Sequence, residues 1–163
     1  MSHRQHPLND INGSVTLVKT ELFFDIMIRE FCTIRNSVLE NGCRIYERVS
    51  IKKSRICEDV DINAGTYIEN AFIWKDVQIV PNCSIIGVTH NFSRDGVNHE
   101  DHFSLITIET GAWIGAGSII LPGVTVGEHS VIVAGSIVNV DIPAHHRYIG
   151  TPLNDNFRLE KIK

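Results

Sequence analysis

The stretch "ITIETGAWIGAGSIILPGVTVGEHSVIVAGSIV" (residues 106–138) carries an aliphatic residue at every sixth position. The side chain four positions after each of these is mostly small or β-branched. A period of six fits neither the 3.6-residue period of an amphipathic helix nor the simple alternation of a strand. It fits a chain that turns a corner every six residues, so that three faces close one coil. The aliphatic positions are Ile108, Ile114, Ile120, Val126, Ile132 and Val138.

The first half of the chain follows the same pattern with one change. Between Leu22 and Ile85 the aliphatic steps are six, six and five residues, so the pattern returns every 17 residues. Coils that stack at the strand spacing of about 4.8 Å would place Ile108 directly over Val126. The next aliphatic positions would stack in the same way, so that each forms a ladder of side chains running through the coils. One coil cannot bury its aliphatic face, but a stack can. We therefore predict an all-β protein, a parallel β-helix with coils at about 11–90 and 108–142 in a single domain over residues 1–163.

Composition and charge exclude several classes of protein. A net charge of -4 and a pI of about 6.0 give no electrostatic case for binding nucleic acid or an anionic membrane. No apolar run approaches the roughly 20 residues of a membrane helix, and the polar N-terminus has no signal-peptide core. Cys32, Cys43 and Cys83 fall on inward positions of the repeat, as buried reduced thiols would. We expect a cytoplasmic protein with no membrane insertion.

The repeat is interrupted once, at "HNFSRDGVNHEDHFS" (residues 90–104). We expect an extruded loop at about 91–105, because the aliphatic ladder pauses there. His90 stands immediately before the break, at the end of a regular turn. A histidine, with an unperturbed pKa of roughly 6.5, is suited to act as a general base at neutral pH. The other histidines are expected to be surface residues: His99, His102, His129, His145 and His146.

The segment "WIGAGSIILPGVTVGEHSVIVAGSIVNVDIPAHHRYIGTP" (residues 113–152) resembles the hexapeptide-repeat acyltransferases. The most similar members are the galactoside and maltose O-acetyltransferases, followed by the streptogramin and chloramphenicol acetyltransferases. The resemblance implies a left-handed parallel β-helix and a homotrimer with active sites between subunits. It also implies acetyl-CoA as the acyl donor, lying along the C-terminal coils, and no metal.

The resemblance also implies roles for single residues. The pair Pro81-Asn82 precedes His90 much as a Pro-Asn pair precedes the family's catalytic histidine, which places the base at His90. Glu100 aligns with a glutamate of the sugar acetyltransferases and would orient His90, with Asp95 as the alternative. Trp113 opens the next coil, where the family places a tryptophan near the acceptor.

Further matches concern the two substrates. Asn70 would contact the acceptor, and Ala116 and Ala134 match positions that face the pantetheine arm of CoA. The lysine and arginine that often follow the last coil of the family are absent here. Arg158 or Lys161 would then supply the charge for the CoA phosphates.

The resulting expectation is an acetyl-CoA-dependent O-acetyltransferase that acts on a hydroxyl of a sugar or glycan precursor by direct transfer in a ternary complex. One alternative is an N-acetyltransferase acting on an amino sugar. A second is a zinc protein resembling the γ-class carbonic anhydrases, although their spaced histidine pair is absent. A third is a non-catalytic β-helix scaffold. The C-terminal residues 143–163 are expected to form a tail, with "LNDNFRLEKIK" as a short helix or tail.

Overall fold

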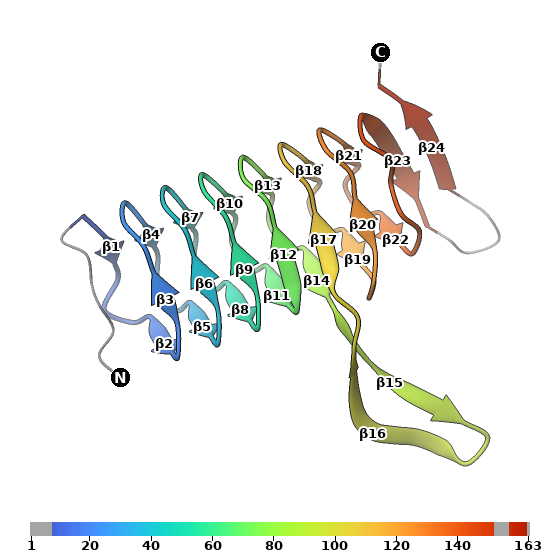
Figure 1. The fold of residues 1–163 in the computed structure, drawn as a ribbon, viewed down its shortest axis with the longest axis horizontal. Coiled ribbons are helices and arrows are strands. Elements are labelled where there is room, and N and C mark those ends of the chain that lie inside the picture. Colours follow the sequence, from blue (N-terminus) through green and yellow to red (C-terminus); the bar gives the residue numbers. More distant parts are fainter. Residues whose placement is uncertain (1–7, 152–156, 163) are drawn as a thin grey trace.

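The computed structural model describes residues 8–151 and 157–162, and the described chain is built of strands without a helix. Short strands alternate between three sheets, so that the chain winds as a stack of coils from the N-terminus to the C-terminus (Figure 1). Pairing inside each sheet is parallel from coil to coil. This is the β-helix expected from the six-residue repeat.

The strands are distributed over the three sheets as follows. The first sheet contains β1 (Asp10–Ile11), β4 (Met27–Ile28), β7 (Arg44–Ile45), β10 (Asp61–Ile62), β13 (Gln78–Ile79), β18 (Trp113–Ile114), β21 (Val131–Ile132), β23 (His146–Gly150) and β24 (Phe157–Lys161). The second contains β2 (Thr16–Val18), β5 (Thr33–Arg35), β8 (Ser50–Lys52), β11 (Tyr67–Glu69), β14 (Ser84–Ile86), β19 (Ile119–Ile120) and β22 (Ile137–Val138). The third contains β3 (Glu21–Leu22), β6 (Val38–Leu39), β9 (Arg55–Ile56), β12 (Ala71–Ile73), β17 (Ile106–Ile108) and β20 (Thr125–Val126).

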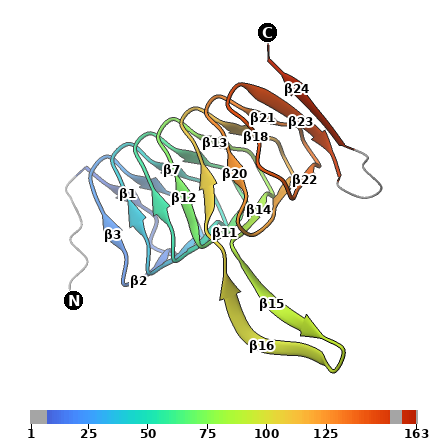
Figure 2. The same cartoon turned by 45° about the vertical axis from the view of Figure 1, so that its right-hand side comes forward.

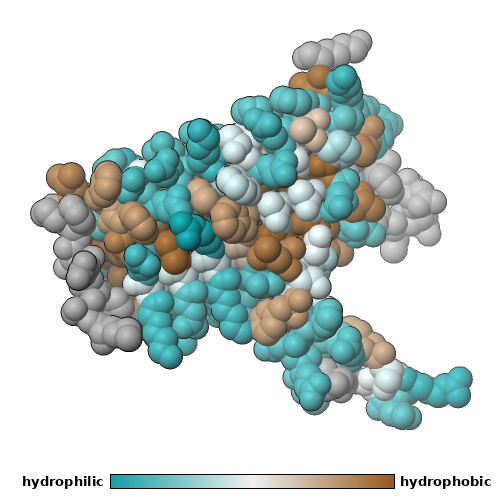
Figure 3. All heavy atoms as spheres, viewed as in Figure 1, coloured by the Kyte–Doolittle hydropathy of each residue, from teal (hydrophilic) through white to brown (hydrophobic). Residues whose placement is uncertain are grey.

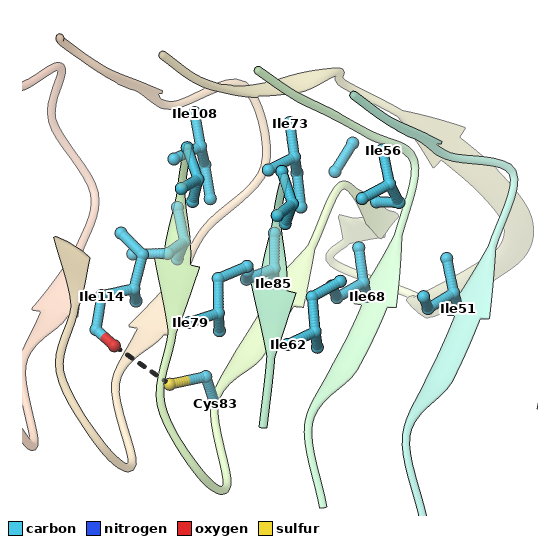
Figure 4. Packing of buried hydrophobic residues seen from close by; sticks show 14 of the residues in the cluster. Ile51, Ile56, Ile62, Ile68, Ile73, Ile79, Cys83, Ile85, Ile108 and Ile114 are labelled. Carbon is cyan, nitrogen blue, oxygen red and sulfur yellow. Dashed lines mark hydrogen bonds between the residues drawn. The ribbon is translucent and has the colours of Figure 1, made fainter. Parts of the chain in front are cut away.

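The interior consists of aliphatic ladders. The predicted pairs are confirmed: Ile108 lies over Val126, and the ladders through Ile114 and Ile120 continue to the next coil in the same way. Their side chains are fully buried and point into a common core (Figure 4). The inward thiols are buried and free as well, and the Cys83 thiol lies 3.9 Å from the carbonyl oxygen of Ile114. Burial raises the pKa of the Cys43 thiol to about 12, which keeps it protonated and unreactive.

The coils turn at three edges, and each edge uses backbone with positive φ. The edge between the second and third sheets carries Lys19, Asn36, Lys53 and Asn70, and we call it the hairpin edge. Its turns are the shortest, which explains the five-residue step of the sequence pattern. After the excursion the same turn runs through Leu121, Pro122 and Gly123, so that the period lengthens from 17 to 18 residues.

The interruption forms an antiparallel hairpin of β15 (Val88–Ser93) and β16 (Gly96–Phe103), rather than an irregular loop. It leaves the coils at Gly87, where an added Cβ would lie 2.3 Å from the carbonyl oxygen of Asn70. At its neck the Ser104 amide donates to the Gly87 carbonyl over 3.0 Å. Strands β12 and β17 pair across the gap, so the coil stack continues as if the hairpin were absent. The hairpin projects away from the coils in two views (Figures 1 and 2).

The C-terminal end differs from the expected tail. Strand β23 adds one more turn to the first sheet, and its Tyr148 takes the ladder position above Ile132, fully buried. The expected short helix is wrong for the described part of this segment, because β24 pairs antiparallel with β23. The open edge of β23 presents unpaired backbone groups, and β24 pairs with them. An ion pair between Arg147 and Glu160 joins the two strands.

Candidate active site

The hairpin holds His90 near its base, on β15 rather than on the last regular turn. The Nδ1 atom of its ring lies 3.3 Å from the backbone carbonyl oxygen of Glu100 and 3.8 Å from Oδ1 of Asp101. The His90 side chain is 43% exposed. A carbonyl facing Nδ1 favours the tautomer that carries its proton there, which leaves Nε2 as the basic nitrogen. This is the arrangement that a histidine base requires.

A register shift in the hairpin determines which residue faces His90. Near the tip Asn91 pairs with Asn98, and continuing that register would place His90 opposite His99. The register shifts between His90 and Asn91, so that Asp101 becomes the partner of His90. Bulges of this kind re-aim side chains and are frequent beside functional sites.

The residues proposed to orient His90 lie at different distances from it. Glu100 approaches the ring through its backbone carbonyl. Asp95 lies in the turn at the hairpin tip, where its amide donates to the Ser93 hydroxyl over 3.2 Å. Asp101 has a carboxylate near the ring and was missed by the sequence argument. The Asp95-Gly96 pair is the turn signal in the sequence that could have indicated a hairpin, but only the register shift brings Asp101 into place.

Asn70 lies on the hairpin edge beneath the neck. Its side-chain amide donates to the Gly87 carbonyl over 2.9 Å, and its own carbonyl accepts from the Ile106 amide over 3.2 Å. These contacts hold the two ends of the hairpin against the coil. A contact of Asn70 with the acceptor stays a prediction.

The residues matched to the donor site lie on another edge, between the first and second sheets. Ala116 and Ala134 are exposed there in successive coils, and the Gly135 amide donates to the Ala116 carbonyl over 2.8 Å. A Cβ on Gly115 would lie 2.4 Å from the Ala134 amide nitrogen, so the coils approach closely at this alanine edge. Trp113 is half-buried on β18, in the first sheet.

The alanine edge and the hairpin therefore face different sides of one chain. In Figure 1 the hairpin leaves the lower edge, whereas β18 lies along the upper side. The structure brings His90, Glu100 and Asn70 to one region and Trp113, Ala116 and Ala134 to another. The two regions therefore lie apart within one chain.

Arg158 and Lys161 lie at the C-terminal end, on β24. Arg158 is exposed and pairs with Ile149 across the two strands. Lys161 lines a pocket of about 580 Å³ beside β21 and β23, together with Val131, Arg147, Glu160 and Ile162. The Arg147 guanidinium lowers the pKa of the Glu160 carboxyl through their hydrogen-bonded ion pair. Because Val131 pairs with Trp113, this pocket adjoins the sheet that carries the predicted acceptor residue Trp113.

Within residues 8–151 and 157–162, no three His, Cys, Asp or Glu side chains gather closely enough to hold a metal ion. Over the same ranges there is no helix with the length and apolar character needed to span a membrane. His129 and His145 stack with their ring centroids 5.5 Å apart on the edge between the third and first sheets.

Comparison with known proteins identifies the repeat. The family "GlmU-like, C-terminal hexapeptide" matches residues 25–104, and the family "Bacterial transferase hexapeptide (six repeats)" matches residues 106–139. The two matches together span most of the chain. The first ends and the second begins directly after the hairpin. The chain belongs to the hexapeptide-repeat transferases.

Several curated relatives are similar in sequence. The bifunctional protein GlmU of Nitratidesulfovibrio vulgaris is 30% identical over 139 residues, which are 85% of this chain and 27% of that protein. The galactoside O-acetyltransferase of Lactococcus lactis is 42% identical over 82 residues, 50% of this chain and 40% of that protein. This chain thus spans between about a quarter and about half the length of the curated relatives it matches.

Solved structures share the fold. AntD from Bacillus cereus, an N-acyltransferase solved with dTDP and coenzyme A, superposes with a TM-score of 0.75 at 20% identity, covering 89% of this chain and 85% of that one. The polySia-specific acetyltransferase NeuO superposes with a TM-score of 0.59 at 20% identity, covering 94% and 85% of the two chains. At these identities the likeness establishes the architecture alone.

Proposed function

We propose that this protein transfers the acetyl group of acetyl-CoA to a hydroxyl of a saccharide. The observation that carries the proposal is His90, held at the hairpin base with Nδ1 facing the Glu100 carbonyl at 3.3 Å. The galactoside O-acetyltransferase relatives and the coenzyme A bound to AntD support the reaction class and the donor. The polySia named as the specificity of NeuO supports a saccharide acceptor.

The proposed chemistry uses the orientation of the His90 ring. Nε2 takes the proton of the acceptor hydroxyl as its oxygen attacks the thioester carbonyl carbon, and a tetrahedral intermediate forms. When that intermediate collapses, the carbon–sulfur bond breaks and the CoA sulfur receives the proton from the imidazolium. The Glu100 carbonyl and the Asp101 carboxylate stabilise the charged ring in between. The acetyl group passes directly from donor to acceptor.

We propose a homotrimer in which the site is shared between subunits. His90 and the alanine edge lie on different sides of one chain, so the hairpin of one subunit would meet the alanine edge of a neighbour. CoA would then lie along Ala116 and Ala134, with Trp113 at the acceptor end and Arg158 or Lys161 near the phosphates. The exposed methyl groups of Ala116 and Ala134 in successive coils support this placement, because such small side chains leave room for the pantetheine arm.

The experiment is an acceptor screen with acetyl-CoA that follows the release of free thiol. Matched sugars that differ only in a hydroxyl or an amine at one position separate O-acetylation from N-acetylation, the alternative that the AntD fold keeps open. Absence of acetyl transfer to every saccharide would contradict the proposal.

The sharing of the site has its own test. His90→Ala and Ala134→Glu are each expected to be inactive, and mixed oligomers of the two should regain activity because one interface keeps both wild-type halves. Failure of the mixed oligomers to recover activity would place the whole site within one chain.

A further inference from the structure

Charge is segregated between the edges of the coil stack. At positions of positive φ, the edge between the third and first sheets carries Asp25, Asp59 and Asp76. The hairpin edge carries Lys19 and Lys53 at its positive-φ positions. A protein with a net charge of -4 therefore has a basic strip on the edge from which the hairpin leaves. The basic strip consists of Lys19, Arg35, Lys52 and Lys53.

The cations of the basic strip are close to one another. Arg35 and Lys52 are direct partners in the parallel pair of β5 and β8. The pKa of Lys52 is nevertheless raised, because its ammonium donates a hydrogen bond to the Tyr67 hydroxyl over 3.1 Å and is attracted by the Glu69 carboxylate, which outweighs the repulsion by Arg35. Like charges in directly opposite positions destabilise a sheet. Among residues 8–151 and 157–162, the basic strip forms no ion pair within 4.0 Å. Lys52 is compensated by Tyr67 and Glu69, so the cations of the strip that lack a counter-charge are Lys19, Arg35 and Lys53.

The backbone also disfavours lysine at this edge. Lys19 and Lys53 adopt φ values of 48° and 47°, in the left-handed region where asparagine is favoured over most side chains. Asn36 and Asn70 occupy the equivalent turns of the alternate coils with φ values of 49° and 55°. Asparagine is therefore sufficient for this turn conformation. The turn itself does not require the positive charge of the two lysines.

The basic strip leads to the candidate active site. The Lys53 ammonium lies 3.8 Å from the centroid of the Phe103 ring at the end of β16, and Phe103 pairs with Val88, two residues before His90. From Lys19 to the neck the strip climbs coil by coil, at about 4.8 Å each. Figure 3 shows hydrophilic side chains along this lower edge up to the start of the hairpin.

We propose that the basic strip binds the negative charges of an extended anionic saccharide whose reacting hydroxyl lies at His90. This inference rests on the proposed acetyl transfer and specifies its acceptor. Repeated cations at coil spacing suit a chain with a charge on successive units, and they lie on a different edge from the predicted CoA path. A neutral acceptor would leave three exposed cations, Lys19, Arg35 and Lys53, without a counter-charge.

The test removes charge without disturbing the turns. The double variant Lys19→Asn with Lys53→Asn copies the residue found at Asn36 and Asn70. Its matched control is Arg48→Asn with Lys75→Asn, which removes the same charge from exposed positions on the other two edges. Three acceptors are compared: oligosialic acids of increasing length, the same oligomers with their carboxylates reduced to alcohols, and a nucleotide-linked sugar.

The expected result is a roughly tenfold rise in KM for the oligosialic acids in the double variant, with kcat unchanged. The effect should grow with oligomer length, shrink at high salt and be absent for the reduced oligomers and for the control variant. Equal effects on charged and reduced oligomers, or none, would overturn the proposal. A rise in KM confined to the nucleotide-linked sugar or to acetyl-CoA would overturn the proposal and indicate that the basic strip binds a diphosphate group instead.

Two further measurements separate this inference from the proposed function. Calorimetric titration of the wild-type protein with oligosialic acid measures binding independently of acetyl transfer. Binding without turnover would support saccharide binding by the basic strip and contradict the proposed acetyl transfer. Absence of binding would overturn the strip. Sedimentation of the double variant decides whether the strip is a contact between subunits, in which case loss of the oligomer would overturn the saccharide proposal.

Discussion

The coils and the hairpin follow opposite rules. In the coils each inward side chain stacks on its equivalents in neighbouring coils, so burial fixes residue type at every step of the ladder. In the hairpin His90, Glu100 and Asp101 are exposed, and burial places few demands on residue type. The comparison predicts that the coils carry the stability of this protein and that the hairpin carries its proposed base. Changes to one part should leave the other nearly intact.

The strongest test of this separation removes the hairpin. The Ser104 amide already bonds to the Gly87 carbonyl, as in a β-turn, so an Asn-Gly link can replace residues 88–103. We expect acetyl transfer to fall to background, while the free energy of unfolding changes by only about 1 kcal/mol. Chemical denaturation and the thiol-release assay measure the two effects. A collapsed fold would show that the hairpin supports the coils.

Replacing His90 alone should come next in size. For His90→Ala we expect kcat to fall by a factor on the order of 10²–10⁴, because the hydroxyl loses its base. The unfolding free energy should change by less than about 0.5 kcal/mol, since the side chain is exposed. His102→Ala on the facing strand is the control and should keep near full activity. The reverse pattern would move the base to His102.

A ladder residue should show the opposite behaviour. Ile68 is fully buried between Ile51 and Ile85, so Ile68→Ala should lower the unfolding free energy by about 2–5 kcal/mol. Leu105→Ala is the control, because this side chain is 53% exposed and should change stability by less than about 0.5 kcal/mol. Activity per folded molecule, measured below the unfolding transition, should stay unchanged in both variants. A selective loss of kcat in Ile68→Ala would contradict the idea that stability and catalysis depend on different parts of the chain.

The smallest expected effect concerns a single hydroxyl at the end of the ladder. The Tyr148 hydroxyl donates to the Ile137 carbonyl over 2.8 Å inside the core. Tyr148→Phe keeps the ring and removes this bond, which should cost about 1 kcal/mol in thermal unfolding. Tyr148→Ala, which also empties the ladder position, should cost about 3–5 kcal/mol. Equal effects of the two variants would mean that the hydroxyl rather than the ring closes the core.

Much of the fold was predictable because its interactions repeat. The register of Ile108 over Val126 follows from sequence spacing alone, since every coil meets a copy of its own pattern. The C-terminal strand was not predictable in this way. Residues 157–161 carry no repeat, and their conformation depends on the open edge of β23 rather than on local preference. Tyr148 was missed for a similar reason, because an aromatic residue on an aliphatic ladder breaks the pattern.

The candidate site divides along the same line. The sequence by itself determined that the chain forms stacked coils, where they pause, and that His90 stands at the pause, because periodic burial leaves a direct trace in residue spacing. Tertiary structure alone decided that the excursion is a paired hairpin, that a register shift brings Asp101 rather than His99 opposite His90, and that the basic strip leads to the neck. These features depend on contacts between segments that share no period, and such contacts leave no regular spacing in the sequence.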